Sequence, residues 1–441
     1  DTCAVMEAAG VEAMVLPHPL PTPGLAVAIR YLGADAGVMV TPSHNPPADN
    51  GYTVSRGDGS QIAPPVDTEI AAHIDAVDSV AQVPRADDGW VTLDESLVEA
   101  YLDRAAAQVD AAGPRDLHVV YTPLHGVGRD LLLAAFERAG FASPTVVPTQ
   151  ADPDPAFPTV SFPNPEEPGA LDAALDLARE QDADLIIAND PDADRCAVAL
   201  PSPDGWRMLT GDEVGALLGW HLLRRGVRGT FANSIVSSTL LGKIARAGGV
   251  PHEETLTGFK WITKAPGLRF GYEEALGYCA DPDAVLDKDG ISAALLVAEL
   301  AASQKAAGAT LLDVLDEIAR THGVHLTGQV SVRVADLSTI ADIMAAVRAS
   351  TPDALGGLAV EAVDDLLAGD GDLPPTDGVR LRLESGARVI VRPSGTEPKV
   401  KCYLEVVEPV GSDDVTAART RASARLEALD GDTRALLVGR A

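Results

Sequence analysis

Short apolar segments recur along the chain, each followed by a loop rich in Gly, Pro or hydroxyl residues and then by a helical pattern. Examples are Gly37–Val40 before the loop Thr41–Pro46, Leu117–Val120, and Leu185–Ala188 before the loop Asn189–Arg195. Strands that alternate with helices are typical of βαβ units, and a wholly apolar strand is typical of one buried on both faces. The pattern therefore predicts α/β domains with parallel sheets over most of the chain.

From about Leu326 the pattern changes to alternating apolar and polar residues. The elements expected there are an alternating strand around Val330, a helix with Ile340, Ile343, Met344 and Val347 on one face, and strands at Val379–Leu383, Arg388–Val391 and Val400–Val406. Alternating strands joined by short turns predict an antiparallel sheet. The C-terminal region is therefore expected to be a small α+β domain. Pro- and Asp-rich segments near 82–95, 201–205 and 368–376 are expected boundaries or loops.

The composition limits the class of protein. A chain of 441 residues with 46% apolar residues is expected to form several domains, each with its own core. Its net charge of −31 argues against general binding to nucleic acid or to an anionic membrane, since both need a basic face. Any phosphate-binding site must therefore concentrate Arg and Lys locally.

The cysteines and the chain start bear on location and completeness. Cys3, Cys196, Cys279 and Cys402 form no CxxC pair, which is typical of reduced thiols and predicts a cytoplasmic protein. No signal peptide and no apolar segment of transmembrane length is found in the sequence. The chain opens at Asp1 with a pattern like the middle of a helix, so a fragment or a processed chain is expected.

A candidate metal loop follows the apolar segment Leu185–Ala188. Asp190, Asp192 and Asp194 alternate, so their carboxylates can converge on one hard cation at the carboxyl end of a strand. A calcium-binding EF-hand loop starts with the same spacing, but it needs Gly at the sixth position and Glu at the twelfth, where this chain has Arg195 and Pro201. A solvated acidic turn is the alternative.

Two further loops suggest phosphate chemistry. Ser43 lies between Pro42 and His44, and prolines in a turn leave its hydroxyl presented rather than bonded to its own backbone. A serine needs a base or a metal to become a nucleophile, so a structural turn is the alternative. The loop Arg392–Lys399 follows another strand and offers a guanidinium, hydroxyls, a glycine and a lysine, the groups that bind a phosphate dianion. The alternative there is a solvated basic turn.

Two acidic segments complete the candidate site. Glu273 and Glu274 lie between Gly271 and Gly277, where carboxylates can accept hydrogen bonds from neighbouring sugar hydroxyls. A helix N-terminus that carries Glu is the alternative. Lys288 lies between two acids in the segment Asp287–Gly290 and suits proton transfer or phosphate contact, unless the segment is a surface turn.

In this order, the loops resemble those of the α-D-phosphohexomutase superfamily, the phosphoglucomutases and phosphomannomutases. The markers are Thr41–Pro46 as phosphoserine loop, Asp190–Arg195 as metal loop, Gly271–Gly277 as sugar-specificity loop and Arg392–Lys399 as phosphate-binding loop. The resemblance covers nearly the whole chain and is strongest to bacterial phospho-sugar mutases and the phosphopentomutase-like branch. It implies three related α/β domains with mixed sheets plus a C-terminal α+β domain around a central cleft. The expected domains are residues 1–95, 96–207, 208–325 and 326–441.

The resemblance also implies a role for each loop. Ser43 would carry the phosphoryl group, and one Mg²⁺ per chain would be held by Ser43, Asp190, Asp192 and Asp194. His44 and Lys288 would be the proton-transfer candidates, and Arg195 would contact the transferring group. Gly271, Glu273 and Glu274 would bind the sugar. The distant phosphate would be bound by the fourth loop, through Arg392, Ser394, Gly395, Thr396 and Lys399.

The implied activity is that of an isomerase that converts a hexose 1-phosphate into the 6-phosphate through a phosphoserine and a sugar bisphosphate, which also serves as primer. Glucose is favoured and mannose is an alternative, in a monomer or homodimer. Phosphopentomutase, glucose-1,6-bisphosphate synthase, a slow phosphatase and a non-catalytic sugar-phosphate-binding remnant remain open.

Three features depart from the family pattern. Pro42 precedes the serine where the family usually has Ala, and Thr53 stands where it usually has a lysine after Asn50-Gly51-Tyr52. The family's opening segment, with an arginine loop and the first strand, is absent from this sequence. We therefore expect domain I to be incomplete.

Overall fold

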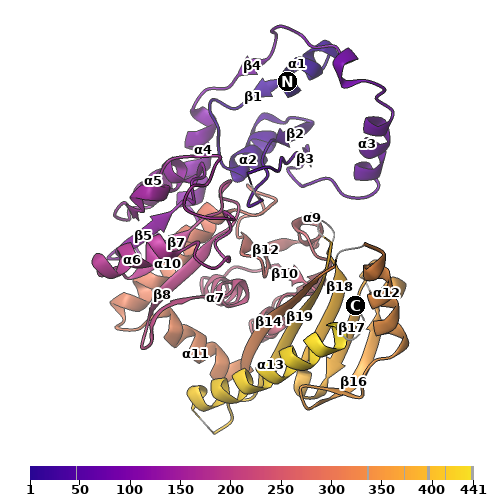
Figure 1. Cartoon of the computed structure of the whole chain (residues 1–441). Helices are drawn as coiled ribbons and strands as arrows, with labels where there is room; N and C mark the ends of the chain where they lie inside the picture. The colour runs from indigo at the N-terminus through magenta and orange to yellow at the C-terminus, as the bar shows by residue number, and fades with distance from the viewer. Residues whose placement is uncertain (46, 335–336, 372, 395–397, 413, 439–441) are drawn as a thin grey trace. The chain divides into compact units, whose positions relative to one another are not determined.

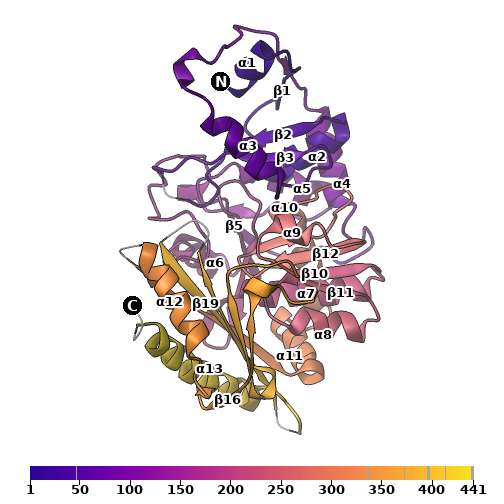
Figure 2. The same cartoon turned by 90° about the vertical axis from the view of Figure 1, so that its right-hand side faces the viewer.

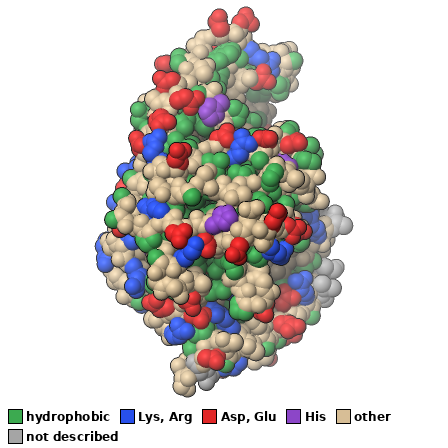
Figure 3. Space-filling model, turned by 90° about the vertical axis from the view of Figure 1, so that its left-hand side faces the viewer, with side chains coloured by type: hydrophobic (Ala, Val, Ile, Leu, Met, Phe, Trp, Pro, Cys, Tyr) green, Lys and Arg blue, Asp and Glu red, His purple; other side chains and the backbone are tan. Residues whose placement is uncertain are grey.

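The computed structural model describes residues 1–441 except 46, 335–336, 372, 395–397, 413 and 439–441 (Figure 1). The chain divides into two compact units. The first comprises Asp1–Val214 and Phe259–Ala309, and the second comprises Gly215–Gly258 and Thr310–Ala441. Among the described residues, no helix combines the length and apolar character needed to cross a membrane. On the face drawn in Figure 3, acidic and basic side chains are interspersed.

The first unit alternates helices with short strands. Its elements are α1 (Thr2–Ala8), β1 (Met14–Val15), α2 (Thr22–Leu32), β2 (Ala36–Met39), β3 (Thr53–Arg56), α3 (Val66–Asp75), β4 (Val91–Thr92), α4 (Ser96–Ala106), β5 (Val119–Thr122), α5 (Gly128–Arg138), β6 (Thr145–Val146), α6 (Asp172–Glu180), β7 (Leu185–Ala188), β8 (Ala197–Ser202), β9 (Gly205–Met208), α9 (Phe259–Ile262), β12 (Leu268–Glu273), β13 (Gly277–Cys279) and α10 (Gly290–Ala306). Helix α7 (Gly211–Arg224) spans the division between the units.

The main sheet of this unit has the order β6-β5-β7-β8-β9. Strands β6, β5 and β7 run parallel, whereas β8 and β9 are antiparallel, so the sheet is mixed. Strand β7 is fully buried, as its apolar sequence predicted, and α6 packs Ala174 and Ala178 against Val120 and Ile186. The prediction of parallel pairing was wrong for β2, which forms an antiparallel pair with β3. The reason is that the chain returns to pair with β2 directly after the following loop, whose described residues contain no helix.

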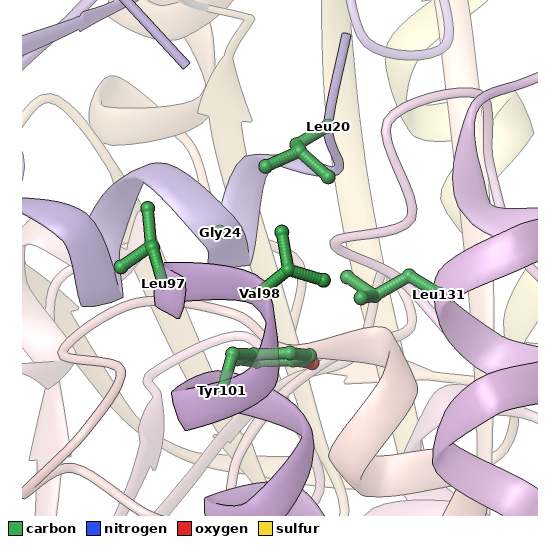
Figure 4. A pocket seen from close by; sticks show the side chains of 6 residues that line it. All are labelled: Leu20, Gly24, Leu97, Val98, Tyr101 and Leu131. Atoms are coloured by element: carbon green, nitrogen blue, oxygen red, sulfur yellow. The ribbon is translucent and has the colours of Figure 1, made fainter. Parts of the chain in front are cut away.

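Helices α4 and α5 pack together, and α10 packs against both. An apolar hollow between α2, α4 and α5 is lined by Leu20, Gly24, Leu97, Val98, Tyr101 and Leu131 (Figure 4). The hydroxyl of Tyr101 donates to Asp289 Oδ1 over 2.9 Å, and the same oxygen accepts from the backbone N–H groups of Ile291 and Ser292. Asp289 therefore caps α10 and ties its start to α4.

The second unit contains the predicted antiparallel sheet. Its elements are β10 (Thr230–Ser234), α8 (Leu240–Ala247), β11 (His252–Thr255), α11 (Leu311–His322), β14 (Val324–Arg333), α12 (Leu337–Ala349), β15 (Ala354–Leu355), β16 (Leu358–Asp365), β17 (Val379–Leu383), β18 (Arg388–Pro393), β19 (Lys399–Glu408) and α13 (Val415–Val438). Six strands in the order β14-β19-β18-β17-β16-β15 pair antiparallel throughout (Figure 2). Helix α12 contributes Ile343, Met344 and Val347 to the core beside this sheet, and helix α13 contributes Ala418 and Ala422. The α+β prediction is confirmed.

A buried ion network joins β18, β19 and the start of α8. Glu405 accepts from Arg388 Nε over 2.8 Å, from Ser238 Oγ over 2.7 Å and from the backbone N–H of Thr239 over 2.9 Å. His325 Nδ1 lies 2.8 Å from the same carboxylate. Burial alone would raise the pKa of Glu405, but the Arg388 charge and these hydrogen bonds outweigh it and hold the pKa below its ordinary value.

We therefore expect Glu405→Gln to destabilise the second unit by about 3–5 kcal/mol at pH 7, because it leaves Arg388 short of its buried counter-charge. A lowered pKa stabilises the fold above the ordinary value of 4.5, and that contribution is lost as the pH falls further. The difference between Glu405→Gln and the parent should thus shrink below pH 4.5. Hydrogen exchange of β14 and β19 amides measures it. The exposed Glu361→Gln is the control, and an equal effect from it would contradict the expectation.

Candidate active site

Three buried carboxylates converge at the end of β7. The ligand oxygens of Asp190, Asp192 and Asp194 all lie within 4.8 Å of one another, as their alternating spacing predicted. The loop bends at Ala193, whose φ of +53° is in the left-handed region, and the Ala193 N–H donates to the Asp190 carbonyl over 2.9 Å. The solvated-turn alternative does not fit residues that are nearly inaccessible to water.

The scaffold holds this metal loop from several sides. The Asn189 side chain accepts from the Tyr121 hydroxyl over 2.9 Å and donates to the Arg195 carbonyl over 2.5 Å, so it joins both ends of the loop. The Val127 N–H donates to the Pro191 carbonyl over 2.8 Å. A Cβ at Gly126 would lie 2.2 Å from that carbonyl oxygen, so only glycine permits this approach.

The hydrogen bonds of the triad leave acceptors for a cation. Asp190 accepts from Ser43 Oγ and from the Arg195 N–H, each over 3.0 Å. Asp192 Oδ2 accepts from Thr22 Oγ1 over 2.7 Å, and Asp194 Oδ2 accepts from Lys288 Nζ. Within the described part of the chain, the buried oxygens Asp192 Oδ1 and Asp194 Oδ1 have no hydrogen-bond partner. Such unpaired oxygens are costly unless a ligand satisfies them, and a hard divalent cation suits this donor set.

The mutual repulsion of the triad carboxylates also favours a bound cation. Burial, followed by the neighbouring carboxylates Asp194 and Asp192, raises the pKa of Asp190 well above its ordinary value. Burial and Asp194 raise the pKa of Asp192 to about 6. Burial would also raise the pKa of Asp194, but Lys288 and Arg195 outweigh it and the pKa is lowered. A divalent cation would relieve the repulsion that opposes ionisation of Asp190 and Asp192.

Ser43 is placed directly beside the triad. Its φ is +51°, its N–H donates to Thr41 Oγ1 over 2.9 Å, and its Oγ donates to Asp190 Oδ2 over 3.0 Å. His44 Nδ1 lies 3.1 Å from Ser43 Oγ. A Cβ at Gly51 would lie 1.8 Å from the Thr41 carbonyl oxygen, so this glycine allows the chain to cross beneath the serine loop. Ser43, His44 and the triad are thus brought together.

Lys288 joins the same cluster from the segment before α10. It is buried, bonds to Asp194 and lies 3.9 Å from Asp287, whose carboxylate accepts from Gln61 Nε2 over 2.8 Å. Burial alone would lower the pKa of Lys288, but Asp194, Asp287 and Glu273 outweigh it and raise the pKa. Lys288 is therefore a buried cation that retains its proton. The surface-turn alternative is inconsistent with this burial.

The sugar-loop candidates lie on a β-hairpin. Strand β12 pairs with β13 through Gly271 with Cys279 and Glu273 with Gly277, so the alternative of a helix N-terminus is wrong. The backbone turns here because Leu276 has a φ of +66°. Burial, only partly offset by Lys288 and Arg195, raises the pKa of Glu273 to about 7. Near neutral pH, Glu273 can therefore gain or lose a proton, and it can donate or accept a hydrogen bond accordingly.

Arg195 connects the metal loop with this hairpin. It forms a backbone bridge to Gly277, and the next residue, Cys196, donates its N–H to the Leu276 carbonyl over 3.0 Å. Arg195 Nε lies 3.7 Å from Asp190 Oδ2 and 3.9 Å from Asp194 Oδ1. This buried N–H has no hydrogen-bond acceptor among the described residues, so it is available to an anionic group beside the triad.

The predicted phosphate loop belongs to the second unit. The Ser394 N–H, just after β18, donates to the carbonyl of Lys399, the first residue of β19, over 2.8 Å. Gly395 and Thr396 lie outside the described residues. Arg392 pairs with Lys401, and Lys399 pairs with Arg333 on β14. Cross-strand partners and alternate residues share a sheet face. Four cations therefore gather at one corner of the sheet, and two of them, Lys401 and Arg333, were not predicted.

Sequence reasoning also missed three polar residues of the first unit. Thr22 and Gln61 contact Asp192 and Asp287, from which they are separated by 170 and 226 residues. No local motif signals such contacts. Asn189 directly precedes the triad, and an amide at the end of a buried strand was a signal that could have identified it.

We expect Gly277→Ala to lower kcat by about 10²-fold, because misplaced catalytic groups cost that much. The new Cβ would lie 2.3 Å from Lys288 Cδ and force this buried side chain to move. Gly431→Ala in α13 is the matched control, since its Cβ would meet nothing within 4 Å. Steady-state kinetics of both variants, with circular dichroism as a check on folding, test the expectation. Equal kcat values in the two variants would contradict it.

A serine hydroxyl is held against a buried carboxylate triad, beside a buried lysine and an arginine N–H without an acceptor among the described residues, on a multi-domain α/β fold. This is the kind of arrangement that metal-assisted phosphoryl transfer requires. The chain belongs to the phosphoglucomutase/phosphomannomutase family, within the α-D-phosphohexomutase superfamily. Models of that family match its alpha/beta/alpha domain I at residues 1–81, domain II at 99–203, domain III at 210–321 and the C-terminal domain at 330–422. The protein is therefore an isomerase of the phosphoglucomutase/phosphomannomutase type, and its α/β fold contains mixed sheets.

Individual relatives carry several substrate names. A probable phosphomannomutase of Haemophilus influenzae is 48% identical over 95% of this chain and 87% of its own length. Human phosphopentomutase is 35% identical over 92% of this chain and 73% of its own length. Mouse glucose 1,6-bisphosphate synthase is 33% identical over 97% of this chain and 76% of its own length. The structure of a putative phosphomannomutase from Thermus thermophilus superposes with a TM-score of 0.72 at 27% identity, covering 98% of this chain and 84% of that one.

Proposed function

We propose that this mutase interconverts hexose 1-phosphate and hexose 6-phosphate through a phosphorylated Ser43 and a bisphosphate intermediate. The observation that supports this most directly is the 3.0 Å contact between Ser43 Oγ and Asp190 at a buried metal-ligand triad. The proposal includes the four domains 1–95, 96–207, 208–325 and 326–441.

The residues divide the transfer between them. A sugar hydroxyl loses its proton as it attacks the phosphorus of phosphoserine. The P–O bond to Ser43 breaks, a P–O bond to the sugar forms, and Ser43 Oγ takes up a proton in exchange. His44, with Nδ1 at 3.1 Å, can return a proton to Ser43 Oγ, and Arg195 Nε can donate to the transferring group. The protonated Lys288 adds positive charge beside it. In the second half, the other phosphate of the bisphosphate returns to Ser43.

The triad fits one Mg²⁺, which Asp190, Asp192, Asp194 and the phosphorylated Ser43 would hold. When bound, the ion would neutralise charge on the transferring phosphoryl group. The remaining task of the protein is positioning, which the buried hydrogen bonds of the metal loop perform.

We infer glucose phosphate as the favoured substrate, with mannose phosphate also accepted. Glu273 and Glu274 can accept hydrogen bonds from two adjacent sugar hydroxyls. Glucose and mannose differ only in configuration at C2, so a carboxylate pair that binds other hydroxyls discriminates weakly between them. The cations Arg392 and Lys399, together with the hydroxyl of Ser394, would supply the distant phosphate site for both orientations of the sugar.

The test is ³¹P NMR of the protein with Mg²⁺, a catalytic amount of glucose 1,6-bisphosphate, and glucose, mannose or ribose 1-phosphate. We expect glucose 1-phosphate to be converted to glucose 6-phosphate, and mannose 1-phosphate to be converted more slowly to mannose 6-phosphate. Conversion of ribose 1-phosphate alone would reassign the protein as a pentomutase. Net accumulation of bisphosphate or of inorganic phosphate would favour a synthase or a phosphatase, and binding without turnover would favour a non-catalytic protein.

A further inference from the structure

Thr22, the first residue of α2, makes two hydrogen bonds to the middle ligand of the metal triad. Its Oγ1 donates to Asp192 Oδ2 over 2.7 Å, and its backbone N–H donates to the Asp192 carbonyl over 2.9 Å. Both partners are buried. The contact joins segments 170 residues apart in the sequence and lies wholly within the first unit.

The hydroxyl bond selects which oxygen of Asp192 is available. With Oδ2 engaged by Thr22, Oδ1 is the buried oxygen left without a hydrogen-bond partner among the described residues. Asp194 shows the same division, since Lys288 occupies Oδ2 and Oδ1 is unpaired. A carboxylate that is fixed in this way loses little rotational freedom when it binds a cation, because its rotation is already restricted in the folded protein.

We propose that Thr22 is a positioning residue for the metal site, orienting Asp192 so that its Oδ1 faces the divalent cation. The inference rests on the proposed metal site and adds to it a residue on α2. Contacts of this kind to metal ligands raise affinity by about 10- to 100-fold.

A purely structural role is the competing explanation. Pro21, at the N-cap position of α2, makes no side-chain capping hydrogen bond, so the two contacts of Thr22 also anchor the start of the helix. Loss of an anchor would lower the melting temperature of the metal-free protein without changing the affinity for metal. Loss of a positioning contact would weaken the metal affinity of a protein that is still folded.

The experiment uses the full chain, freed of phosphate and metal, and titrates it with Mn²⁺ by electron paramagnetic resonance and with Mg²⁺ by calorimetry. Thr22→Val removes the hydroxyl at similar volume, and Thr22→Ser keeps it. We expect the Kd of Thr22→Val to rise by about 10- to 100-fold, and that of Thr22→Ser to stay close to the parent value. Thr22→Ala removes the same hydroxyl with a smaller side chain, should the valine variant fail to fold.

Unchanged affinity in a folded Thr22→Val or Thr22→Ala protein would overturn the inference, as would equal weakening in Thr22→Ser. A parent chain that binds neither ion would overturn the proposed metal site together with this inference. The two failures are thus distinguishable.

Discussion

Replacing Ser43 with alanine is expected to abolish sugar-phosphate interconversion, with a loss of at least about 10³-fold, since removal of a covalent nucleophile typically costs 10⁴-fold or more. Only the hydroxyl group is lost, with its contacts to Asp190 Oδ2 over 3.0 Å and to His44 Nδ1 over 3.1 Å. The fold and the carboxylate triad should therefore survive. The ³¹P NMR assay with primer measures the loss directly.

The control is Ser143→Ala, which removes an exposed hydroxyl from a loop of the same unit. Its turnover should match that of the parent chain. Incubation with labelled glucose 1,6-bisphosphate supplies a second readout, because the parent and Ser143→Ala should retain one labelled phosphoryl group per chain and Ser43→Ala none. Normal turnover by Ser43→Ala would refute the proposed mechanism.

Replacing Lys288 with methionine is expected to reduce both activity and stability. The methionine keeps the apolar stem but removes a buried ammonium group that pairs with Asp194. Breaking a buried ion pair from one side typically costs about 3–5 kcal/mol, because the remaining charge is left uncompensated. Turnover should also fall by about 10²- to 10⁴-fold, as expected for loss of a group that assists proton or phosphoryl transfer.

Lys305→Met is the matched control. It breaks a partly exposed ion pair between Asp184 and Lys305, which lies on α10, the helix that follows Lys288. Such surface pairs contribute about 0–1 kcal/mol, so stability and turnover should change little. Thermal unfolding in the absence of metal, together with steady-state kinetics, compares the two variants. Similar stability losses in both variants would contradict the expectation that the buried ion pair of Lys288 contributes more to stability than the pair of Lys305.

Much of the fold was predictable because its signals are local. The apolar segment of β7 and the alternation of β14 and β19 depend on residues that are neighbours in sequence, and the structure places both as expected. The pairing of β2 was not predictable, because a strand's sequence does not determine which neighbour it meets. The hairpin that carries Glu273 was ambiguous from the sequence, since glutamates are also common at a helix N-terminus.

The sequence by itself selected Asp190, Asp192 and Asp194 as candidate metal ligands, because they alternate in the loop that follows one strand, and it identified the family through the order of four loops. Only the tertiary structure decided that Ser43, Lys288 and Thr22 reach that loop, and which carboxylate oxygen each one occupies. The physical reason is range. A motif reports contacts within a few residues, whereas the charges and hydrogen bonds that set this chemistry come from residues 94 to 170 positions away in the sequence.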